Sequence, residues 1–381
     1  LPDAEPFVKR PLETSLAYRY NGELPRMTDN IRTERTANPR KKPADGDLTF
    51  GQIFTDHMFV MEGTKQGGWK DPRIVPYGPL SLEPAAAVLH YAQAIFEGLK
   101  AYRSVSGRIK LFRPDKNIGR FNRSAQRLCI PTIDPDLFLA SLKQLIALDQ
   151  DWVPSAPGTS LYVRPFAFGR DADLRVRPSD TYQFYIILSP VGSYYAEGFN
   201  PLRIRVESRY ARAIRGGTGA AKAAGNYAGS LLAGEEAHQE GFSQILWLDG
   251  ILQEYIEEVG SMNIAFVIDK VLVTPPATGT ILEGVTRDSV LQLAKDSGTV
   301  VEERPISVTE VFNAARDGTL TEVFGMGTAA VISPVSELSY KKQNVLINNG
   351  KVGPLAQQLF NDLSDIQRGI KPDDHRWMVP V

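Results

Sequence analysis

The chain has 381 residues and a formal net charge of −1, and 43% of its residues are hydrophobic and 23% charged. This composition is typical of a folded globular protein rather than a disordered one, and the length favours two domains. The near-zero charge gives no general support for a nucleic-acid partner, and no run of about 18 apolar residues exists that could span a membrane.

Cysteine and histidine usage narrows the possible chemistry further. Cys129 is the single cysteine, so a disulfide within the chain is impossible, and we expect a reducing compartment, the cytoplasm, although a cysteine-poor secreted protein would look the same. The four histidines show no metal-ligand spacing, which predicts no zinc site, and the G-x-S-x-G motif of serine hydrolases is absent. Residues 1–16 contain no apolar stretch of the kind that secretory signals have.

The first half of the chain, residues 1–196, predicts an α/β domain. Residues 1–48 are polar and rich in proline, asparagine, arginine and lysine, and we expect a loop-dominated lead-in. Beyond it, clustered or alternating apolar residues predict strands, and apolar residues at helical spacing predict helices. We expect strands within 48–62, 107–114, 160–169 and 182–192, and helices within 113–130 and 134–153.

A segment rich in glycine, proline and aromatic residues follows, and we expect an interdomain linker at residues 197–208. The second half, residues 209–381, alternates helix and strand, so the whole predicts an α/β protein of the α+β type, with two domains meeting at a cleft and no internal repeat. Ser307 and Glu310 form a capping-box pattern, and Asp269-Lys270 predicts a hairpin turn. We expect helices within 224–241 (ended by Gly241), 285–298, 308–318 and 353–369, strands within 243–250 and 299–306, and a hairpin within 262–276.

The stretch RGGTGAAKAAGNYAGSLL, residues 215–232, places Lys222 among glycines and alanines. No Asp or Glu occurs between Ser208 and Gly234, whereas three arginines precede the lysine. Small neighbours leave room for a bulky partner, and nearby cations and burial both favour the uncharged amine. Such an amine is a nucleophile toward carbonyl groups and can form a Schiff base. The alternative is a solvated lysine at the start of a helix.

The same stretch does not match a nucleotide-binding loop. A P-loop needs lysine directly after its last glycine and a hydroxyl residue next. Here Ala220 and Ala221 separate Gly219 from Lys222, and Ala223 follows. The dinucleotide-binding pattern G-x-G-x-x-G is also absent, so nucleotide chemistry is excluded at this position.

The second half of the chain also contains groups that could bind a carbonyl cofactor. Such a cofactor would need an acidic side chain at a ring nitrogen and N–H donors at a phosphate. Glu257 and Glu258 are adjacent, and in a strand one of the two would point inward. Residues 284–286 open a predicted helix whose free N–H groups favour a phosphate. The glycine-threonine turn at 327–328 offers further N–H groups to an anion. Each signal alone is a common surface or turn feature, but together they favour pyridoxal phosphate.

Several of these stretches occur together in a known family. The segments KAAGNYAGSLLA, QILWLDG, EEVGSMN, LEGVTRDS and GMGTAAVISPV resemble those of branched-chain amino acid aminotransferases, as do TDHM, LHYAQAIFEGLKAYR, LFRPDKN and YVRPF in the first half. The resemblance runs from about Phe50 to the last predicted helix. It implies a fold-type IV enzyme with a small N-terminal domain, a larger C-terminal cofactor-binding domain and the active site at their interface. The implied reaction is the pyridoxal-phosphate-dependent transamination of leucine, isoleucine or valine with 2-oxoglutarate, which gives branched 2-oxo acids and glutamate.

The resemblance also implies site residues. Lys222 would form the internal aldimine and later move the Cα proton, Tyr227 would bond the cofactor O3′, and Glu258 would pair with the pyridine nitrogen. The implied pyridoxal 5′-phosphate-binding residues are Arg113, Lys222, Tyr227, Glu258, Ser261, Val285, Thr286, Gly327 and Thr328, with Arg113 on the phosphate. The implied substrate-binding residues are Phe50, Tyr91, Phe96, Tyr162, Arg164, Tyr194, Thr328 and Ala329, with Thr328 and Ala329 on the α-carboxylate and Arg164 on the side-chain carboxylate of glutamate. A homodimer is implied, in which a partner loop completes the pocket.

Alternatives remain open at this level. The aromatic residues could be plain core residues, Arg164 a buried ion-pair partner, and Arg113 a helix N-terminal residue beside Pro114. The same fold also serves D-amino acid aminotransferases and aminodeoxychorismate lyases, and a non-catalytic metabolite-binding protein would keep it too. The redox-active C-x-x-C of some animal members is absent, because residues 330–333 read Ala-Val-Ile-Ser.

Overall fold

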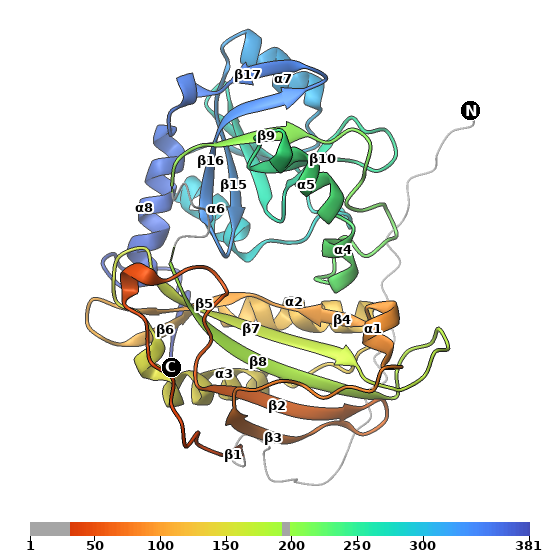
Figure 1. The fold of residues 1–381 in the computed structure, drawn as a ribbon. Helices are drawn as coiled ribbons and strands as arrows, with labels where there is room; N and C mark the ends of the chain where they lie inside the picture. The colour runs from red at the N-terminus through yellow and green to blue at the C-terminus, as the bar shows by residue number, and fades with distance from the viewer. Residues whose placement is uncertain (1–30, 193–198) are drawn as a thin grey trace.

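The computed structural model describes residues 31–192 and 199–381, which form two halves, each built on a nine-stranded sheet (Figure 1). In the first half the strand order is β1-β3-β2-β8-β7-β5-β6-β18, and β4 pairs with β7. These strands are β1 (Arg32–Thr33), β2 (His57–Thr64), β3 (Gly68–Pro76), β4 (Ala94–Phe96), β5 (Leu99–Arg103), β6 (Ile109–Phe112), β7 (Ser160–Gly169), β8 (Thr181–Val191) and β18 (Met378–Pro380).

The second half holds the other sheet, with the order β11-β10-β9-β16-β15-β12-β13-β14 and β17 paired with β16. Its strands are β9 (Leu202–Val206), β10 (Gln244–Leu248), β11 (Ile256–Val259), β12 (Asn263–Ile268), β13 (Val271–Thr274), β14 (Val301–Glu303), β15 (Leu320–Gly327), β16 (Val331–Tyr340) and β17 (Gln343–Leu346). The α-helices are α1 (Ala87–Tyr91), α2 (Pro114–Arg127), α3 (Pro135–Leu148), α4 (Ala224–Ala228), α5 (Leu231–Gln239), α6 (Val285–Asp296), α7 (Val308–Arg316) and α8 (Pro354–Arg368).

The core of the first half includes aromatic rings from α2, α3 and the sheet. Phe121, Phe138 and Phe184 are fully buried and meet edge to face, with ring centroids 5.1 to 5.5 Å apart. Burying such a ring contributes roughly 1.5–3 kcal/mol. The side chain of Asp134 caps α3 by accepting the N–H groups of Asp136 and Leu137. The helices and strands predicted for 107–192 are confirmed.

Local signals in the second half also behave as predicted. Asp269 and Lys270 have φ values of 47° and 68°, as a two-residue hairpin turn between β12 and β13 requires. Ser307 caps α7, because its hydroxyl accepts the N–H of Glu310. Helix α8 ends at Gly369, whose φ of 70° favours glycine.

Three features differ from the sequence-based expectation. The helix expected within 224–241 is two helices, α4 and α5, because the Ser230 hydroxyl bonds the Tyr227 carbonyl at 2.7 Å and the chain turns there. Strand β9 lies inside the expected linker at 197–208 and belongs to the second sheet. The C-terminal strand β18 returns to the first sheet beside β6. The domain boundaries themselves stay a prediction.

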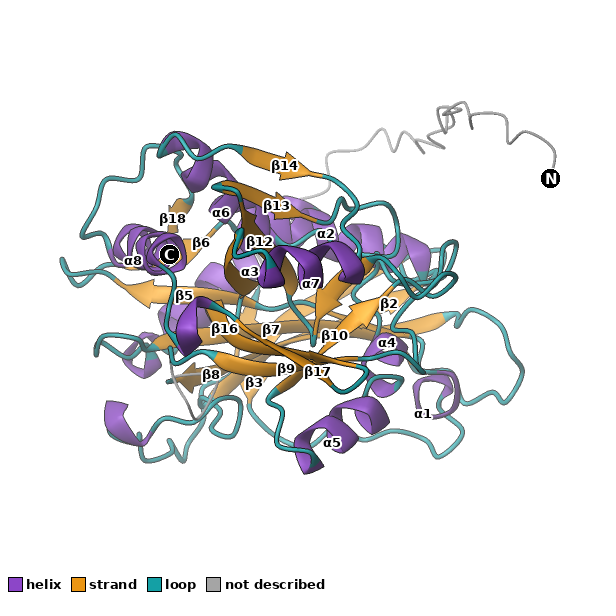
Figure 2. Cartoon of the chain, turned by 90° about the horizontal axis from the view of Figure 1, so that it is seen from above, coloured by secondary structure: helices purple, strands orange, loops and turns teal. Residues whose placement is uncertain are grey.

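The two halves meet around residues 95–96 and 222–223. The Phe96 N–H donates to the Lys222 carbonyl at 3.1 Å, and Ile95 forms an isolated bridge with Ala223. Figure 2, a view from above, shows α1 and α5 at the same margin of the molecule, which is the face toward the viewer in Figure 1. Within residues 31–192 and 199–381, no helix is long and apolar enough to cross a bilayer.

Candidate active site

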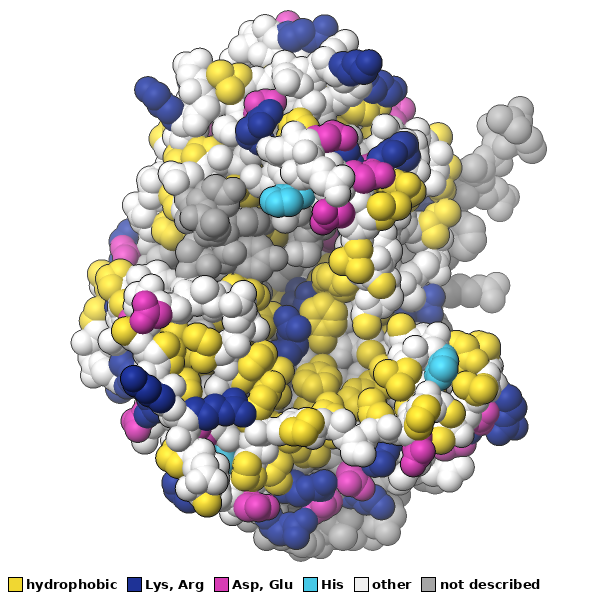
Figure 3. Space-filling model, viewed as in Figure 1, with side chains coloured by type: hydrophobic (Ala, Val, Ile, Leu, Met, Phe, Trp, Pro, Cys, Tyr) yellow, Lys and Arg dark blue, Asp and Glu magenta, His cyan; other side chains and the backbone are white. Residues whose placement is uncertain are grey.

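A cavity of about 420 Å³ is lined by residues of both halves. Figure 3 shows a hollow on one face of the molecule, with hydrophobic side chains and Lys or Arg side chains along it. The predicted site residues that line the cavity are Phe50, Phe96, Tyr162, Arg164, Lys222, Tyr227, Glu258, Ser261, Val285, Thr286, Gly327, Thr328 and Ala329. The structure therefore brings together residues that lie up to 279 positions apart in the chain.

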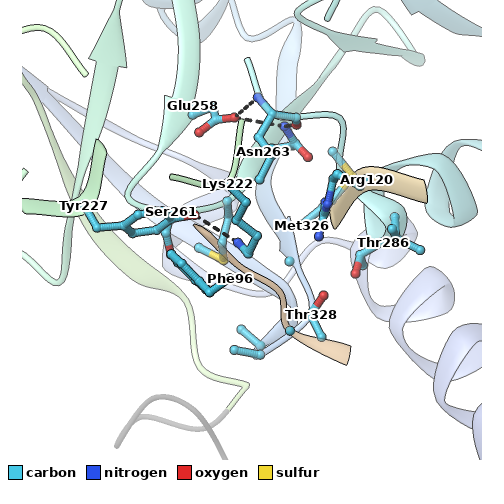
Figure 4. Close-up of a pocket in the computed structure, with 18 of the residues that line it drawn as sticks. Phe96, Arg120, Lys222, Tyr227, Glu258, Ser261, Asn263, Thr286, Met326 and Thr328 are labelled. Atoms are coloured by element: carbon cyan, nitrogen blue, oxygen red, sulfur yellow. Dashed lines mark hydrogen bonds between the residues drawn. The ribbon is translucent and has the colours of Figure 1, made fainter. Parts of the chain in front are cut away.

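Lys222 is held by its backbone and presents its amine to the cavity. The Ser124 hydroxyl of α2 accepts the Lys222 N–H at 2.9 Å, and Phe96 bonds the Lys222 carbonyl. The Lys222 Nζ lies 2.9 Å from the Tyr227 hydroxyl and 4.7 Å from the centroid of the Phe96 ring (Figure 4). No acid lies within ion-pair distance of this amine among the described residues, so a phenol rather than a carboxylate holds it.

Glu258 is the acid that faces the cavity. Its side chain is 4% exposed, and one carboxylate oxygen accepts the Leu282 N–H at 2.8 Å. The other oxygen lies 3.1 Å from the Arg212 guanidinium. Burial raises the pKa of Glu258 above its usual value, against the opposing charge of Arg212. Glu257 is buried as well, and burial raises its pKa, but it does not line the cavity.

The N-terminus of α6 and a hairpin turn give the cavity two groups of backbone donors. Gly284 is the N-cap of α6, and Val285 and Thr286 open the helix, where N–H groups lack partners within the helix. A Cβ on Gly284 would lie 1.9 Å from the Asn263 Oδ1, so only glycine fits this approach. Thr328 lies in the turn between β15 and β16, and Figure 4 shows Thr286 and Thr328 on the same side of Lys222. Both groups suit an anion.

Arg120 of α2 lines the same part of the cavity and was not predicted. Its Nε and Nη2 bind both carboxylate oxygens of Glu97, at 2.6 and 2.9 Å, and its Nη1 donates to the Glu283 carbonyl at 2.8 Å. Burial alone would raise the pKa of Glu97, but the charge and hydrogen bond of Arg120, together with Lys222 and Asn117, hold that pKa below its usual value. Among the described residues, three of the five guanidinium N–H groups are thus engaged, and two are left for an anion.

The contacts of Arg113 in this structure do not support its predicted role on the phosphate, which stays a prediction. Arg113 does not line the cavity, and its Nη1 donates to the Ser289 hydroxyl at 2.7 Å. Its Nη2 lies 2.6 Å from Asp288, and its guanidinium stacks on Trp377. The cause is local: Arg113 is the N-cap of α2 with a φ of 45°, and it ties α2 to α6 and the C-terminal strand. This position agrees with the alternative interpretation of Arg113 as a helix N-terminal residue beside Pro114.

Aromatic side chains and one arginine form the remaining wall. The Phe50 and Tyr162 rings meet edge to face at 4.9 Å. The Arg164 guanidinium lies 4.8 Å from the Phe96 ring centroid and 5.2 Å from that of Tyr162, and it donates to the Tyr162 hydroxyl at 2.9 Å. Its Nε is buried and has no hydrogen-bond partner among the described residues. This wall can therefore contact an apolar group and still offer a donor to a carboxylate.

Two predicted substrate-binding residues do not contribute to this wall. Tyr91 is absent from the cavity lining, is 39% exposed, and donates its hydroxyl to the Leu174 carbonyl, so its substrate-binding role stays a prediction. The physical reason is that α1 ends at Tyr91 and turns the ring toward the loop that holds Leu174 and Val176. Tyr194 lies outside the described residues.

Glu97 and Arg120 were not predicted as site residues, but the sequence around each contains a feature that indicates a buried charge. Glu97 sits in the apolar run AIFEGL, where an acid needs a buried partner. Arg113 and Arg120 are seven residues apart, a spacing that on a continuous helix would place both on the same face, although in the structure Arg113 is the N-cap of α2. The sequence pattern alone does not decide between them, because only the fold shows which arginine reaches the cavity.

Comparison with known proteins agrees with this geometry. Residues 94–338 match the family described as amino-transferase class IV. Branched-chain-amino-acid aminotransferase 2 of Bacillus subtilis (strain 168) is 54% identical over 92% of this chain and 97% of its own, and branched-chain-amino-acid transaminase 1 of the same organism is 50% identical over 93% and 100%. The Escherichia coli branched-chain amino acid aminotransferase has a TM-score of 0.70 at 28% identity, covering 84% of this chain and 98% of its own. A T.th. branched-chain amino acid aminotransferase complexed with N-(5′-phosphopyridoxyl)-L-glutamate has a TM-score of 0.68 at 28% identity, with coverage of 84% and 97%.

The family match covers well over half of the chain, so the chain belongs to the class IV aminotransferases, pyridoxal-phosphate enzymes of fold type IV. Within that class it is a branched-chain-amino-acid aminotransferase, because relatives of that group are about 50% identical over nearly its whole length. The predicted family, fold class, reaction and cofactor are confirmed. The roles of single residues are not tested by these comparisons.

Proposed function

We propose that the cavity holds pyridoxal 5′-phosphate with its aldehyde at Lys222, and that Lys222 moves the proton at the substrate Cα. The observation that supports this most directly is the Lys222 amine in the cavity, bonded to Tyr227 at 2.9 Å and free of any ion pair with a described residue. A lysine placed in this way can act as nucleophile and base.

The donor set fits such a cofactor. Two unused N–H groups of Arg120, the first N–H groups of α6 and the Thr328 turn suit a phosphate, and the close approach at Gly284 leaves no room for a side chain there. Glu258 offers a carboxylate for the ring nitrogen and Tyr227 a hydroxyl for the ring oxygen. Arg120 takes the role that the sequence had given to Arg113.

Each residue around the bound cofactor has a separate proposed role, set by its position in the cavity. The bound ring supplies a sink for the electron pair released when the substrate loses its Cα proton. Glu258 keeps a proton on the ring nitrogen, and Arg212 favours the ionised form of Glu258. Lys222 carries the proton at Cα, and Tyr227 orients the amine between transfers. Phe96 packs against Tyr227, with ring centroids 4.7 Å apart, and keeps water from this bond.

Dual substrate recognition follows from the aromatic wall. Phe50, Phe96 and Tyr162 exclude water around a branched apolar side chain. The Arg164 guanidinium, with its buried Nε unpartnered in the described part of the chain, receives the second carboxylate of glutamate or 2-oxoglutarate. The backbone at Thr328 and Ala329 meets the α-carboxylate that all substrates share.

The proposed assembly is a homodimer in the cytoplasm. Leu174 and Val176 are 61% and 85% exposed, beside Tyr91, in a loop held by ion pairs of Arg177 with Asp171 and Asp173. Elements α1 and α5 lie on the face where hydrophobic side chains gather around the hollow (Figure 3). A second copy placed against this face would cover these side chains and bring its loop to the cavity, and Tyr91 would then contribute to the partner's site rather than to its own. The proposed division into two domains falls before Leu202, where β9 begins.

The test uses the cofactor-loaded protein. The protein should be yellow, and borohydride should fix the cofactor covalently to the peptide that contains Lys222. The Lys222→Ala variant should retain cofactor through its phosphate contacts and show no turnover with leucine and 2-oxoglutarate. Labelling of another lysine, or full activity of Lys222→Ala, would overturn the assignment.

A further inference from the structure

Lys100 is a buried cation with no acidic partner. It lies on β5, is 6% exposed, and its Nζ donates to the Ala329 carbonyl at 2.7 Å. No carboxylate within 4 Å pairs with it in the described part of the chain. Burial lowers the pKa of Lys100 from 10.5 to about 8. No pattern in the sequence predicts a role for this residue.

A buried lysine without an acidic partner lowers the stability of the folded protein, which indicates that it has a functional role. An ammonium has three N–H groups, and the described residues accept only one from Lys100. A buried charge without a counter-ion is unfavourable, and a methionine of similar length would fill the same space without that cost. Buried, perturbed charges beside a cleft are typical of functional sites.

Lys100 lies next to the turn between β15 and β16, which lines the part of the cavity that is proposed to bind anions. Ala329 and Ala330 both line the cavity, and the turn that contains them joins β15 to β16. Lys100 is also the register partner of Tyr162 across the ladder between β5 and β7. The ammonium therefore lies directly behind a turn whose other side faces the substrate.

The peptide unit between Ala329 and Ala330 connects Lys100 to the side of the turn that faces the cavity. A trans peptide directs its carbonyl and its N–H in opposite directions, and the described chain contains no cis bond. Fixing the Ala329 carbonyl on Lys100 therefore fixes this peptide plane, and with it the end of the turn whose Thr328 and Ala329 backbone is proposed to meet the α-carboxylate. The positive charge on the carbonyl side also polarises this peptide, which makes its N–H a stronger donor.

We propose that Lys100 is a positioning residue for the substrate α-carboxylate, holding the 328–330 turn in its anion-binding form and supplying the positive charge behind it. This rests on the proposed function, in which that turn meets the α-carboxylate. Its effect differs from that of Arg164, because the α-carboxylate is common to every substrate and the second carboxylate belongs to glutamate alone. Lys100 acts through the turn and does not touch the substrate.

The experiment measures binding of two unreactive leucine analogues to the cofactor-loaded enzyme by calorimetry. One is 4-methylpentanoate, which keeps the carboxylate, and the other is the neutral 4-methylpentanamide. The variants are Lys100→Met, which removes the bond and the charge, Lys100→Gln, which keeps a donor without charge, and Lys100→Arg, which keeps the charge. Cofactor absorbance and thermal midpoint are recorded for each.

We expect Lys100→Met to weaken binding of the carboxylate by about tenfold or more and to leave the amide unchanged. Its thermal midpoint at pH 7 should equal or exceed that of the parent. Lys100→Gln should lose most of the preference for the acid, and Lys100→Arg should restore it. If carboxylate and amide weaken equally in Lys100→Gln and Lys100→Met, the lysine is only structural, and unchanged carboxylate binding refutes any role.

The failure of this proposal is separable from a failure of the proposed function. If the parent enzyme does not transaminate leucine, or borohydride labels a lysine other than Lys222, the function itself is wrong whatever Lys100 does. If the parent passes both tests and the Lys100 variants keep their preference for the acid, only the role of Lys100 is wrong.

Discussion

The two ends of the cavity are built in different ways. At the end with Glu258 and the N-terminus of α6, each buried charge has a fixed partner: Arg212 lies 3.1 Å from Glu258, and Arg120 binds Glu97 at 2.6 Å. At the other end, three aromatic side chains surround Arg164, whose buried Nε is unpartnered among the described residues. One end suits a group that stays bound, and the other suits ligands that exchange.

The difference teaches how a single site can serve two kinds of ligand. Paired charges are already neutralised, so they orient a bound group without changing their own state. An arginine stacked on rings keeps its charge accessible while its flat faces remain apolar. An apolar side chain can lie on the rings, and a carboxylate can meet the Arg164 guanidinium, which lines the cavity. The following substitutions separate the two ends, from the largest expected effect to the smallest.

Glu258→Gln should give the largest loss, because it removes the charge that keeps the ring nitrogen protonated. We expect the half-reaction with leucine to slow on the order of 10²-fold or more, with cofactor still bound. Stopped-flow absorbance of the loaded enzyme measures this step. The matched control is Glu257→Gln, which changes an adjacent buried acid outside the cavity lining and should turn over like the parent. The assignment of the two acids is reversed if Glu257→Gln is the damaged variant.

Arg120→Met should weaken the hold on the cofactor rather than the chemistry. A charge-assisted hydrogen bond to a buried anion contributes about 1.5–3 kcal/mol, so the dissociation constant should rise roughly 10- to 100-fold. Equilibrium dialysis against pyridoxal 5′-phosphate measures it.

Arg113→Met is the control for Arg120→Met. It breaks bonds to Ser289 and Asp288 and should lower the thermal midpoint while affinity for the cofactor stays near that of the parent. A larger loss of affinity in Arg113→Met than in Arg120→Met would restore the original sequence-based prediction.

Arg164→Leu should act only on the exchanging end. We expect KM for glutamate and 2-oxoglutarate to rise about tenfold, because the second carboxylate loses its charged donor, while KM for leucine changes little. Steady-state kinetics with each amino donor gives both values. Equal increases for glutamate and leucine would mean that Arg164 supports the aromatic wall instead of reading a carboxylate.

Sequence alone predicts the end with fixed charges better than the exchanging end. Lys222, Glu258 and the opening of α6 stand in short segments whose spacing is set by one strand end or one helix start. Local signals of this kind, such as the Ser307 cap and the Asp269-Lys270 turn, depend on neighbours in the chain and are readable there.

Features that depend on distant contacts are not readable in this way. The choice of Arg120 over Arg113 depends on Glu97, which lies in another element. Tyr91 faces a loop 83 residues away, and the end of the linker depends on β9 pairing with β16. Lys100 shows no motif at all, because its meaning lies in a carbonyl 229 positions later in the chain.

The smallest expected effect concerns Lys100, which lies behind the turn near both ends. Its pKa is about 8 in the folded protein and near 10.5 when unfolded. Between these values the unfolded chain binds the proton and the folded one has released it, so the contribution of Lys100 to stability rises with pH. Below pH 8 both states are protonated, and the cost of burying the charge is fully present.

The thermal midpoints of the parent and of Lys100→Met, compared at pH 7.5 and pH 9.5, isolate the pH-dependent contribution of Lys100 to stability. Methionine does not titrate, and the contributions of other groups cancel in the difference. The parent should gain on the variant by a few degrees or less at the higher pH. A constant difference would mean that the lysine is not desolvated, and a difference of the opposite sign would mean that an acid pairs with it in solution.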